Sequence, residues 1–193
     1  MKMVELLDKT FFLREDVVNQ ARELLGCVLF TTVDGELTSG IITETEAYAG
    51  INDKASHAYS GRRTARTETM FCAGGLAYVY LCYGMYHLFN VVTGPEDMPN
   101  AVLIRAISPI NGTETMMRRR KRNVLKGLTD GPGKLTIALG INHLHNKFPL
   151  DGNIIGIARH YFPAAEAITT TPRIGIDYAG EDALLPYRFL LKL

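Results

Sequence analysis

The segment ITETEAYAG, at residues 42–50, places two glutamates and a tyrosine at alternate positions of a run that otherwise resembles a buried strand. Side chains alternate between the two faces of a strand, so we expect Glu44, Glu46 and Tyr48 on one face. Neighbouring carboxylates repel each other, and half-buried strands are depleted in glutamate. This pattern indicates a face that meets solvent, a metal or a reaction.

Tyrosines are concentrated in one later segment, where four of them lie within nine residues: Tyr78, Tyr80, Tyr83 and Tyr86. In the predicted strand LAYVYLCY, Tyr78 and Tyr80 share a face, whereas Tyr83 falls on the turn with Gly84. Tyrosines favour strands and fill cores, which is the simpler explanation for any single one. A tyrosine on a glycine turn fits a core less well and suits a wedge between bases.

The histidines give a weaker signal. His57 lies in a polar loop and is by itself more often a hydrogen-bonded residue than a catalytic one. In H-L-H, His143 and His145 would share a strand face and suggest a metal. The sequence has no C-x2-C pair, no HExxH motif and no Asp-rich loop, so we expect no metal site and no cofactor.

The sequence lacks the motifs of several other kinds of chemistry. GPGK, at residues 131–134, lacks the Walker pattern, although a helix that begins there could offer its amides to a single phosphate. No G-x-S-x-G segment is present. A carboxylate, aromatic rings and arginines remain. Together they suit the activation of a water beside a stacked, flat and in some cases cationic group.

Composition is that of one globular domain, residues 1–193, with 47% hydrophobic and 21% charged residues. Charges interrupt the first 16 residues every few positions, and no apolar run approaches the roughly 20 residues of a membrane span. We therefore expect neither a signal peptide nor a membrane anchor. Three cysteines, an odd number, favour reduced thiols and a cytoplasmic location.

The net charge of +1 gives no general support for nucleic-acid binding, but the basic residues are clustered. One run, RRRKR, covers residues 118–122, and a second cluster contains Arg62, Arg63 and Arg66. Either cluster alone could be a solvated face. Two clusters in a nearly neutral chain favour phosphate contact.

The pattern of elements predicts an α+β fold in which strands dominate. Helices are expected at residues 14–26, 113–122 and 132–139, the last with proline in its first turn and Gly140 after it. Strands are expected at residues 27–33, 36–48, 76–83, 86–92, 101–108, 154–161, 173–178 and 186–191. Asp34-Gly35 predicts a hairpin between the first two strands. Short links imply a curved, mostly antiparallel sheet surrounded by a few helices.

Six segments together resemble the alkyladenine (3-methyladenine) DNA glycosylase family, and they occur in the family's order over nearly the whole chain. The segments are ETEAYAGINDKASHAYSG (44–61), GRRTARTETMF (61–71), LAYVYLCYGMYHLFNVV (76–92), AVLIRAISPING (101–112), GPGKL (131–135) and PRIGIDYAGE (172–181). The combination of ETEAY with a following histidine and YVYxxYGMYxxxN is highly specific. The extended tail of some eukaryotic members is absent, which implies a compact, bacterial form.

The resemblance implies roles for individual residues. Glu46 corresponds to the general base that activates the attacking water, and Arg105 to the arginine that holds this water and a phosphate; Glu44 is expected to be structural. The walls of the base pocket are expected to be Tyr48, His57, Tyr80 and Asn90. The inserted wedge is expected to be Tyr83, flanked by Met85 and Tyr86. The other expected DNA contacts are Arg62, Arg63, Arg66, Arg118, Arg119 and Lys134.

The implied activity is that of a monofunctional DNA glycosylase. Such an enzyme flips a damaged purine out of duplex DNA and hydrolyses its glycosidic bond without cleaving the strand. The expected partner is double-stranded DNA with a damaged purine, bound by a monomer at the bacterial nucleoid. Two alternatives remain from the residues alone: an O-glycoside hydrolase, for which Glu44 and Glu46 would be the carboxylate pair, and a non-enzymatic nucleic-acid-binding module.

Overall fold

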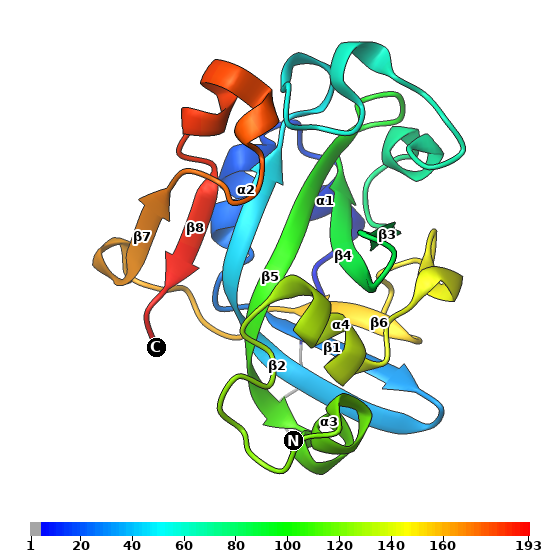
Figure 1. Cartoon of the computed structure of the whole chain (residues 1–193), viewed down its shortest axis with the longest axis vertical. Coiled ribbons are helices and arrows are strands. Elements are labelled where there is room, and N and C mark those ends of the chain that lie inside the picture. Colours follow the sequence, from blue (N-terminus) through cyan, green and yellow to red (C-terminus); the bar gives the residue numbers. More distant parts are fainter. Residues whose placement is uncertain (1–4) are drawn as a thin grey trace.

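A computed structural model describes residues 5–193 of the chain. Its centre is one curled, eight-stranded antiparallel sheet with strand order β3-β4-β5-β2-β1-β6, and β8 and β7 extend it beside β2 (Figure 1). The strands are β1 (Val28–Val33), β2 (Glu36–Tyr48), β3 (Ala77–Cys82), β4 (Tyr86–Thr93), β5 (Asn100–Asn111), β6 (Ile155–Ala158), β7 (Ile168–Thr171) and β8 (Arg188–Leu191). This arrangement confirms the predicted α+β class and the antiparallel sheet.

Strand β2 organises the sheet because it has partners along its whole length. Its first half forms the predicted hairpin with β1, and Asp34 and Gly35 both adopt positive φ angles, 56° and 75°, as a tight two-residue turn requires. Its second half pairs with β8 from Glu44 to Glu46. On its other side it pairs with β5 from Ser39 to Tyr48.

The pairing of β2 with β5 contains three register shifts, and the two of them that flank Glu44 compensate each other. Ile42 pairs with Ile107, Glu44 with Ala106 and Thr45 with Ile104. One residue is therefore unpaired on each strand, Thr43 on β2 and Arg105 on β5. Bulges of this kind re-aim side chains, and this one lies where Glu44, Glu46 and Arg105 meet.

Short helices cover the sheet. The α-helices are α1 (Lys9–Phe12), α2 (Val17–Glu23), α3 (Thr113–Arg120) and α4 (Pro132–Leu139), and the 3₁₀ helices are η1 (Gly50–Asn52), η2 (Tyr59–Gly61), η3 (Glu68–Phe71), η4 (His143–His145), η5 (Ala165–Ala167) and η6 (Asp177–Leu184). Helix α2 packs on β2 and β5, and α4 packs on β4 and β5 and supports α3. Within residues 5–193, none of the helices has the length and apolar content needed to cross a bilayer.

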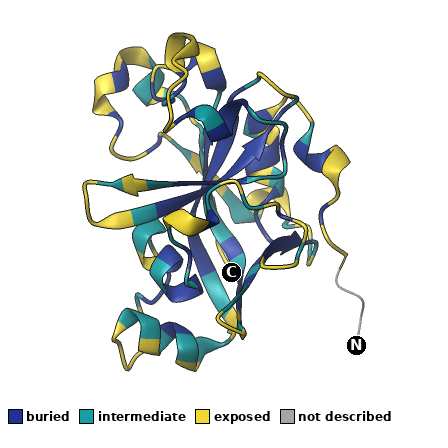
Figure 2. Ribbon diagram, turned by 90° about the vertical axis from the view of Figure 1, so that its right-hand side faces the viewer, coloured by how far each residue is buried: buried dark blue, intermediate teal, exposed yellow. Residues whose placement is uncertain are grey.

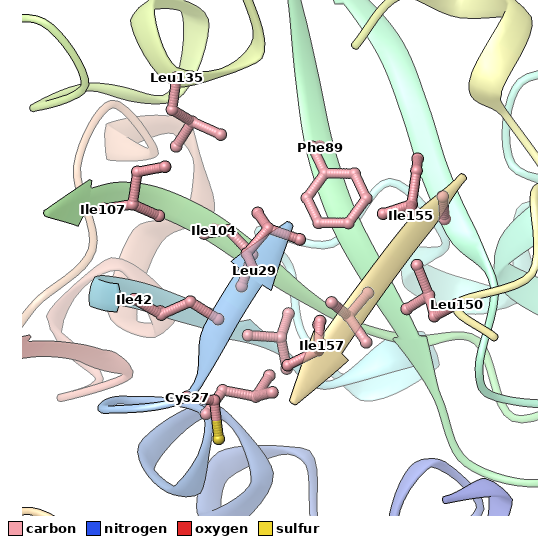
Figure 3. Close-up of a cluster of buried hydrophobic side chains, with 14 of the residues drawn as sticks. Cys27, Leu29, Ile42, Phe89, Ile104, Ile107, Leu135, Leu150, Ile155 and Ile157 are labelled. Atoms are coloured by element: carbon pink, nitrogen blue, oxygen red, sulfur yellow. The ribbon is translucent and has the colours of Figure 1, made fainter. Parts of the chain in front are cut away.

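The main core gathers apolar side chains from the strands and from α2 and α4 (Figure 3). Strands β3 and β4 are buried on both faces. Val79 and Phe89 belong to the main core, whereas Tyr78 and Val92 pack in a smaller cluster under the loop that contains Met70. Exposed residues are concentrated in the outer loops and short helices (Figure 2). The second face of β3 and β4 therefore forms the floor of a site that is covered by the segment containing Met70.

Several predicted elements differ from the structure. Helix α2 has seven residues instead of about three turns, because it begins only after its N-cap Asp16 and residues 24–26 form a turn. The predicted strand at 173–178 is wrong: the segment is a loop that leads into η6. Strand β7 was not predicted, and β6 is shorter than the predicted strand at 154–161. Helix α3 ends at Arg120 because Lys121 adopts a left-handed conformation.

Candidate active site

A cavity of about 700 Å³ opens between the second face of the sheet, the loop after β2, the start of α4 and the segment after Arg173. This volume suits a small flat ligand. The residues of the predicted site that line it are Tyr48, His57, Arg66, Tyr80, Tyr83, Tyr86, Asn90, Arg105 and Lys134. Segments that are far apart in the sequence thus meet in one place.

Glu46 lies fully buried beside this cavity, on β2. Its Oε2 accepts a hydrogen bond from the Tyr48 hydroxyl at 2.9 Å and is 3.3 Å from Nη1 of Arg105. Its Oε1 accepts the backbone N–H of Ile174 at 2.8 Å. A carboxylate offers about four acceptor positions, so these three donors leave one position on Oε1 for a further donor such as water.

Arg105 connects the two glutamates of the opening motif. Its Nε donates to Oε1 of Glu44 at 2.7 Å, and its Nη1 faces Glu46. Glu44 also accepts a hydrogen bond from Arg188 of β8 at 2.7 Å. Burial alone would lower the pKa of Arg105, but the carboxylates of Glu46 and Glu44 outweigh it and raise this pKa. Glu44 thus holds Arg105, which confirms that the two glutamates share one face.

Tyr48 sits between Glu46 and a buried ion pair. Burial, and then the charge of Glu46, raise the pKa of Tyr48, so its hydroxyl keeps its proton and acts as a donor. The Arg173 guanidinium lies over the Tyr48 ring, 4.9 Å from its centroid. Arg173 donates to both carboxylate oxygens of Asp53 and to the carbonyl of Ala47. These contacts hold the Arg173 guanidinium against one face of the Tyr48 ring and so fix the position of the ring.

Three further aromatic rings form another wall. Tyr78 and Tyr80 lie on one face of β3 with ring centroids 5.3 Å apart, as the strand alternation predicts. Nδ1 of His57 is 3.0 Å from the Tyr78 hydroxyl, and the His57 ring meets Tyr80 edge-on at 4.7 Å. Burial, and then the charges of Arg66 and Arg62, lower the pKa of His57 to about 4. His57 is therefore a neutral hydrogen-bonding group at pH 7.

Asn90 forms part of the floor. It is 3% exposed, and its Nδ2 donates to the carbonyl of Tyr78 on the neighbouring strand at 3.1 Å. Because this bond fixes the orientation of the side chain, Asn90 presents a rigid wall to whatever occupies the cavity.

The hairpin between β3 and β4 projects apolar groups beside the cavity mouth. Tyr83 and Met85 are 86% and 67% exposed, respectively, and Tyr86 is 44% exposed. Tyr83 and Gly84 have φ angles of 48° and 68°, and the N–H of Met85 closes the turn on Cys82. A left-handed conformation costs a non-glycine residue about 1 kcal/mol. The turn holds a large aromatic ring in solvent at that cost, which marks a surface for binding.

The match to a family of known proteins covers almost the whole chain. The model of the methylpurine-DNA glycosylase (MPG) family matches residues 10–193. This chain belongs to that family. A relative from Chlamydia abortus is 52% identical over 97% of this chain and 99% of its own length, and one from Bacillus thuringiensis is 47% identical over 92% of both chains. Both relatives carry the name "Putative 3-methyladenine DNA glycosylase".

The basic residues of this family member have different surroundings. Arg63 pairs with Glu68 and Asp97 and covers the Phe71 ring, whereas Arg66 lines the cavity and Arg62 is exposed. Of the run at 118–122, Arg118 and Arg119 contact Glu36, and Arg119 also donates to the carbonyls of Val33 and Ala138. Arg120 lines the cavity, as does Lys134, which pairs with Asp130. These contacts give Arg63, Arg118 and Arg119 a structural role, whether or not they also meet DNA.

The two histidines of H-L-H lie on the 3₁₀ helix η4, so the idea of a shared strand face is wrong. Nδ1 of His145 accepts the N–H of Asn142 in a capping box, and the His143 ring lies 5.6 Å from His87. Among residues 5–193, no three His, Cys, Asp or Glu side chains converge as metal ligands would.

Sequence reasoning missed several residues of this glycosylase-family site. Tyr78 had a usable signal, because it alternates with Tyr80, and it orients His57. Arg173 lies inside the motif PRIGIDYAGE, but its partner Asp53 is 120 positions away in the chain, with no local signal. Tyr178, 71% exposed and donating to the carbonyl of Ala55 at 3.2 Å, also lines the cavity.

Proposed function

We propose that this protein is a monofunctional DNA glycosylase. It binds duplex DNA, receives a flipped, damaged purine in the cavity and hydrolyses the bond between C1′ and the base with a water activated by Glu46. The observation that carries this proposal is the fully buried Glu46, which accepts hydrogen bonds from Tyr48 and from the N–H of Ile174 and faces Arg105, beside a cavity with aromatic walls. The family match and the names of the relatives support it.

The chemistry follows from the placement of the groups. The water forms a bond to C1′ and gives its proton to Glu46, while the bond from C1′ to the purine nitrogen breaks and its electron pair leaves with the base. Alkylated purines that carry a positive charge accept this pair readily. Arg105, held by Glu44, lies beside Glu46 and there stabilises negative charge on the water as it forms.

Cleavage of the strand requires a different nucleophile, an uncharged amine beside C1′. Lys134 is the lysine that lines the cavity, and its Nζ is 2.8 Å from the carboxylate of Asp130. This ion pair engages the amine that would otherwise be available as a nucleophile. We therefore assign the protein hydrolysis without strand cleavage.

A flipped base leaves a gap in the duplex, and opening the stack costs a few kcal/mol. We assign the filling of that gap to Tyr83, which is exposed at the tip of the hairpin and lines the cavity, with Met85 and Tyr86 beside it. Arg66, Arg120 and Lys134, which line the cavity, and the exposed Arg62 provide positive charge for the phosphates.

Single-turnover excision tests the proposal. Duplexes with 3-methyladenine, 7-methylguanine, hypoxanthine or 1,N6-ethenoadenine are incubated with excess protein, and the released base and the intact abasic strand are measured. Release of at least one damaged purine without strand cleavage is the expected result. Failure to release any of them would contradict the proposal.

The matched pair of variants Glu46→Gln and Glu44→Gln tests the assignment of the base. Glu46→Gln should still bind lesion-containing duplex but lose at least about 100-fold in excision rate, the range expected for removal of a general base. Glu44→Gln keeps Glu46 and weakens the contacts of Glu44 with Arg105 and Arg188, so a much smaller loss is expected. A larger loss in Glu44→Gln would reverse the two roles.

A further inference from the structure

Two tyrosine rings of the pocket, those of Tyr48 and Tyr80, each carry a guanidinium group on one face. Arg173 lies 4.9 Å from the ring centroid of Tyr48, and Arg66 lies 4.7 Å from that of Tyr80. A cation on an aromatic ring interacts with the negative charge of the ring face. A positively charged purine stacked in this cavity would interact with the negatively charged faces of the same rings. The rings are thus already partly engaged by positive charge before any base enters.

The two guanidinium groups differ in how their charge is balanced. Arg173 has a fully buried side chain, and both oxygens of Asp53 accept its hydrogen bonds, so this pair has no net charge. Arg66 is exposed in the loop between η2 and η3. Within residues 5–193, no carboxylate forms an ion pair with it. Of the two, Arg66 is therefore the one that adds a net positive charge to the pocket.

The charge of Arg66 reaches the groups that a base would touch. Its Nη2 is 3.4 Å from Nε2 of His57, and Arg66 itself lines the cavity. After burial, the charge of Arg66 is the next largest cause of the lowered pKa of His57. The pocket thus disfavours the cationic form of a ring that is part of its own wall. A cationic purine beside His57 and Tyr80 would meet the same repulsion, whereas a neutral purine would not.

We propose that Arg66 determines the charge preference of the base pocket: its guanidinium opposes cationic damaged purines and so raises the relative excision of neutral ones. This inference rests on the proposed function, because it assumes that a damaged purine occupies the cavity. It assigns Arg66 a role in addition to phosphate binding. A residue that binds only phosphate changes the affinity for every duplex alike, whereas Arg66 should alter the ratio between two kinds of lesion.

The test compares 7-methylguanine, which is cationic, with hypoxanthine, which is neutral, in duplexes of identical sequence. Single-turnover rates at saturating protein are measured for the wild type and for Arg66→Gln, which removes the charge but keeps a polar, although shorter, side chain. The rate on 7-methylguanine relative to hypoxanthine should rise roughly threefold to fivefold, which lies within the range of one exposed cation–π contact. An unchanged or lower ratio would overturn the inference.

Two control variants separate the contact with the ring from the general charge of the loop. Arg66→Lys keeps a positive charge that can lie over the Tyr80 ring and should keep the wild-type ratio within about twofold. Arg62→Gln removes a neighbouring exposed charge that does not line the cavity, so it should slow both reactions at subsaturating protein and change their ratio less than Arg66→Gln does. A ratio that rises as much in Arg62→Gln as in Arg66→Gln would overturn the assignment to Arg66. If the wild type excises neither lesion, the proposed function fails instead, which is a distinguishable result.

Discussion

Asp53 and Arg173 form an ion pair beneath Tyr48 with side chains that are only 2% and 0% exposed. The pair joins the loop after β2 to the segment before η6, and the Arg173 guanidinium supports the Tyr48 ring. Tyr48 in turn donates to Glu46. The position of the glutamate therefore depends on a charge pair that never touches the cavity.

Removal of one partner of this pair should destabilise the fold. Asp53→Asn leaves the Arg173 charge buried without a counter-ion, and we expect a loss of about 3–5 kcal/mol in the free energy of unfolding. The matched control is Glu68→Gln, which breaks the exposed pair with Arg63 and should cost at most about 1 kcal/mol. Urea denaturation followed by circular dichroism measures both. Equal losses in the two variants would contradict a structural role for the buried pair.

Tyr83→Ala should weaken binding to a lesion in duplex DNA more than binding to the same lesion in a single strand. The reason is that a wedge compensates only for the unstacking of a duplex. Fluorescence anisotropy with both substrates gives the two affinities. The control is Phe162→Ala, which removes another ring, 77% exposed and outside the lining of the cavity. If Tyr83→Ala affects both substrates equally, Tyr83 is not a wedge.

Acid should destabilise the protein partly through His57. The pKa of this histidine falls from 6.5 to about 4 on folding, so between these two values the unfolded chain binds a proton that the folded chain does not. The free energy of unfolding therefore decreases as the pH falls from 6.5 towards 4, by at most about 3 kcal/mol from this residue. Below about pH 4 the loss of stability from His57 has reached its full size. Above about pH 6.5 His57 no longer contributes to the pH dependence of the free energy of unfolding.

The measurement is the thermal midpoint between pH 7 and pH 4.5 for the wild type and for His57→Gln. His87 and His145 also have pKa values that burial lowers, so some acid sensitivity remains in the variant. The wild type should nevertheless lose stability more steeply. Parallel curves would show that His57 is protonated equally easily in the folded and unfolded states.

The sequence predicted the strands of the site because their alternation is local. Glu44, Glu46 and Tyr48, like Tyr78 and Tyr80, share a face for the same reason: a strand repeats every two residues. The bulge at Arg105 had no such signal, because the register depends on two strands about 60 residues apart in the chain. The contact between Asp53 and Arg173 was equally hidden.

The error at residues 173–178 has a related cause. RIGIDY alternates as a strand does, but Gly175 has a φ of 74°, and Arg173 is held by Asp53 while the N–H of Ile174 binds Glu46. Backbone groups that bind the site cannot also form a sheet. Tertiary contacts therefore override the alternating sequence pattern of residues 173–178, because this segment contributes groups to the candidate active site.

The last prediction concerns guanine. A guanine in the cavity presents a 2-amino group where adenine and hypoxanthine present hydrogen. The Asn90 side chain is held by its hydrogen bond to the Tyr78 carbonyl, so it cannot move aside to make room for that amino group. Steric rejection of added bulk is a strong form of discrimination. Asn90→Ser removes part of this wall, so excision of normal guanine should rise while excision of hypoxanthine changes little.

Competitive excision of guanine and hypoxanthine from matched duplexes measures the effect as one ratio. Asn146→Ser is the control, because Asn146 also binds β3, through the N–H of Val79, but does not line the cavity. It should destabilise the protein without a change in the ratio. A guanine-to-hypoxanthine ratio that stays constant in Asn90→Ser would place the filter elsewhere, on Leu103 or Ala101 of β5, which line the same cavity.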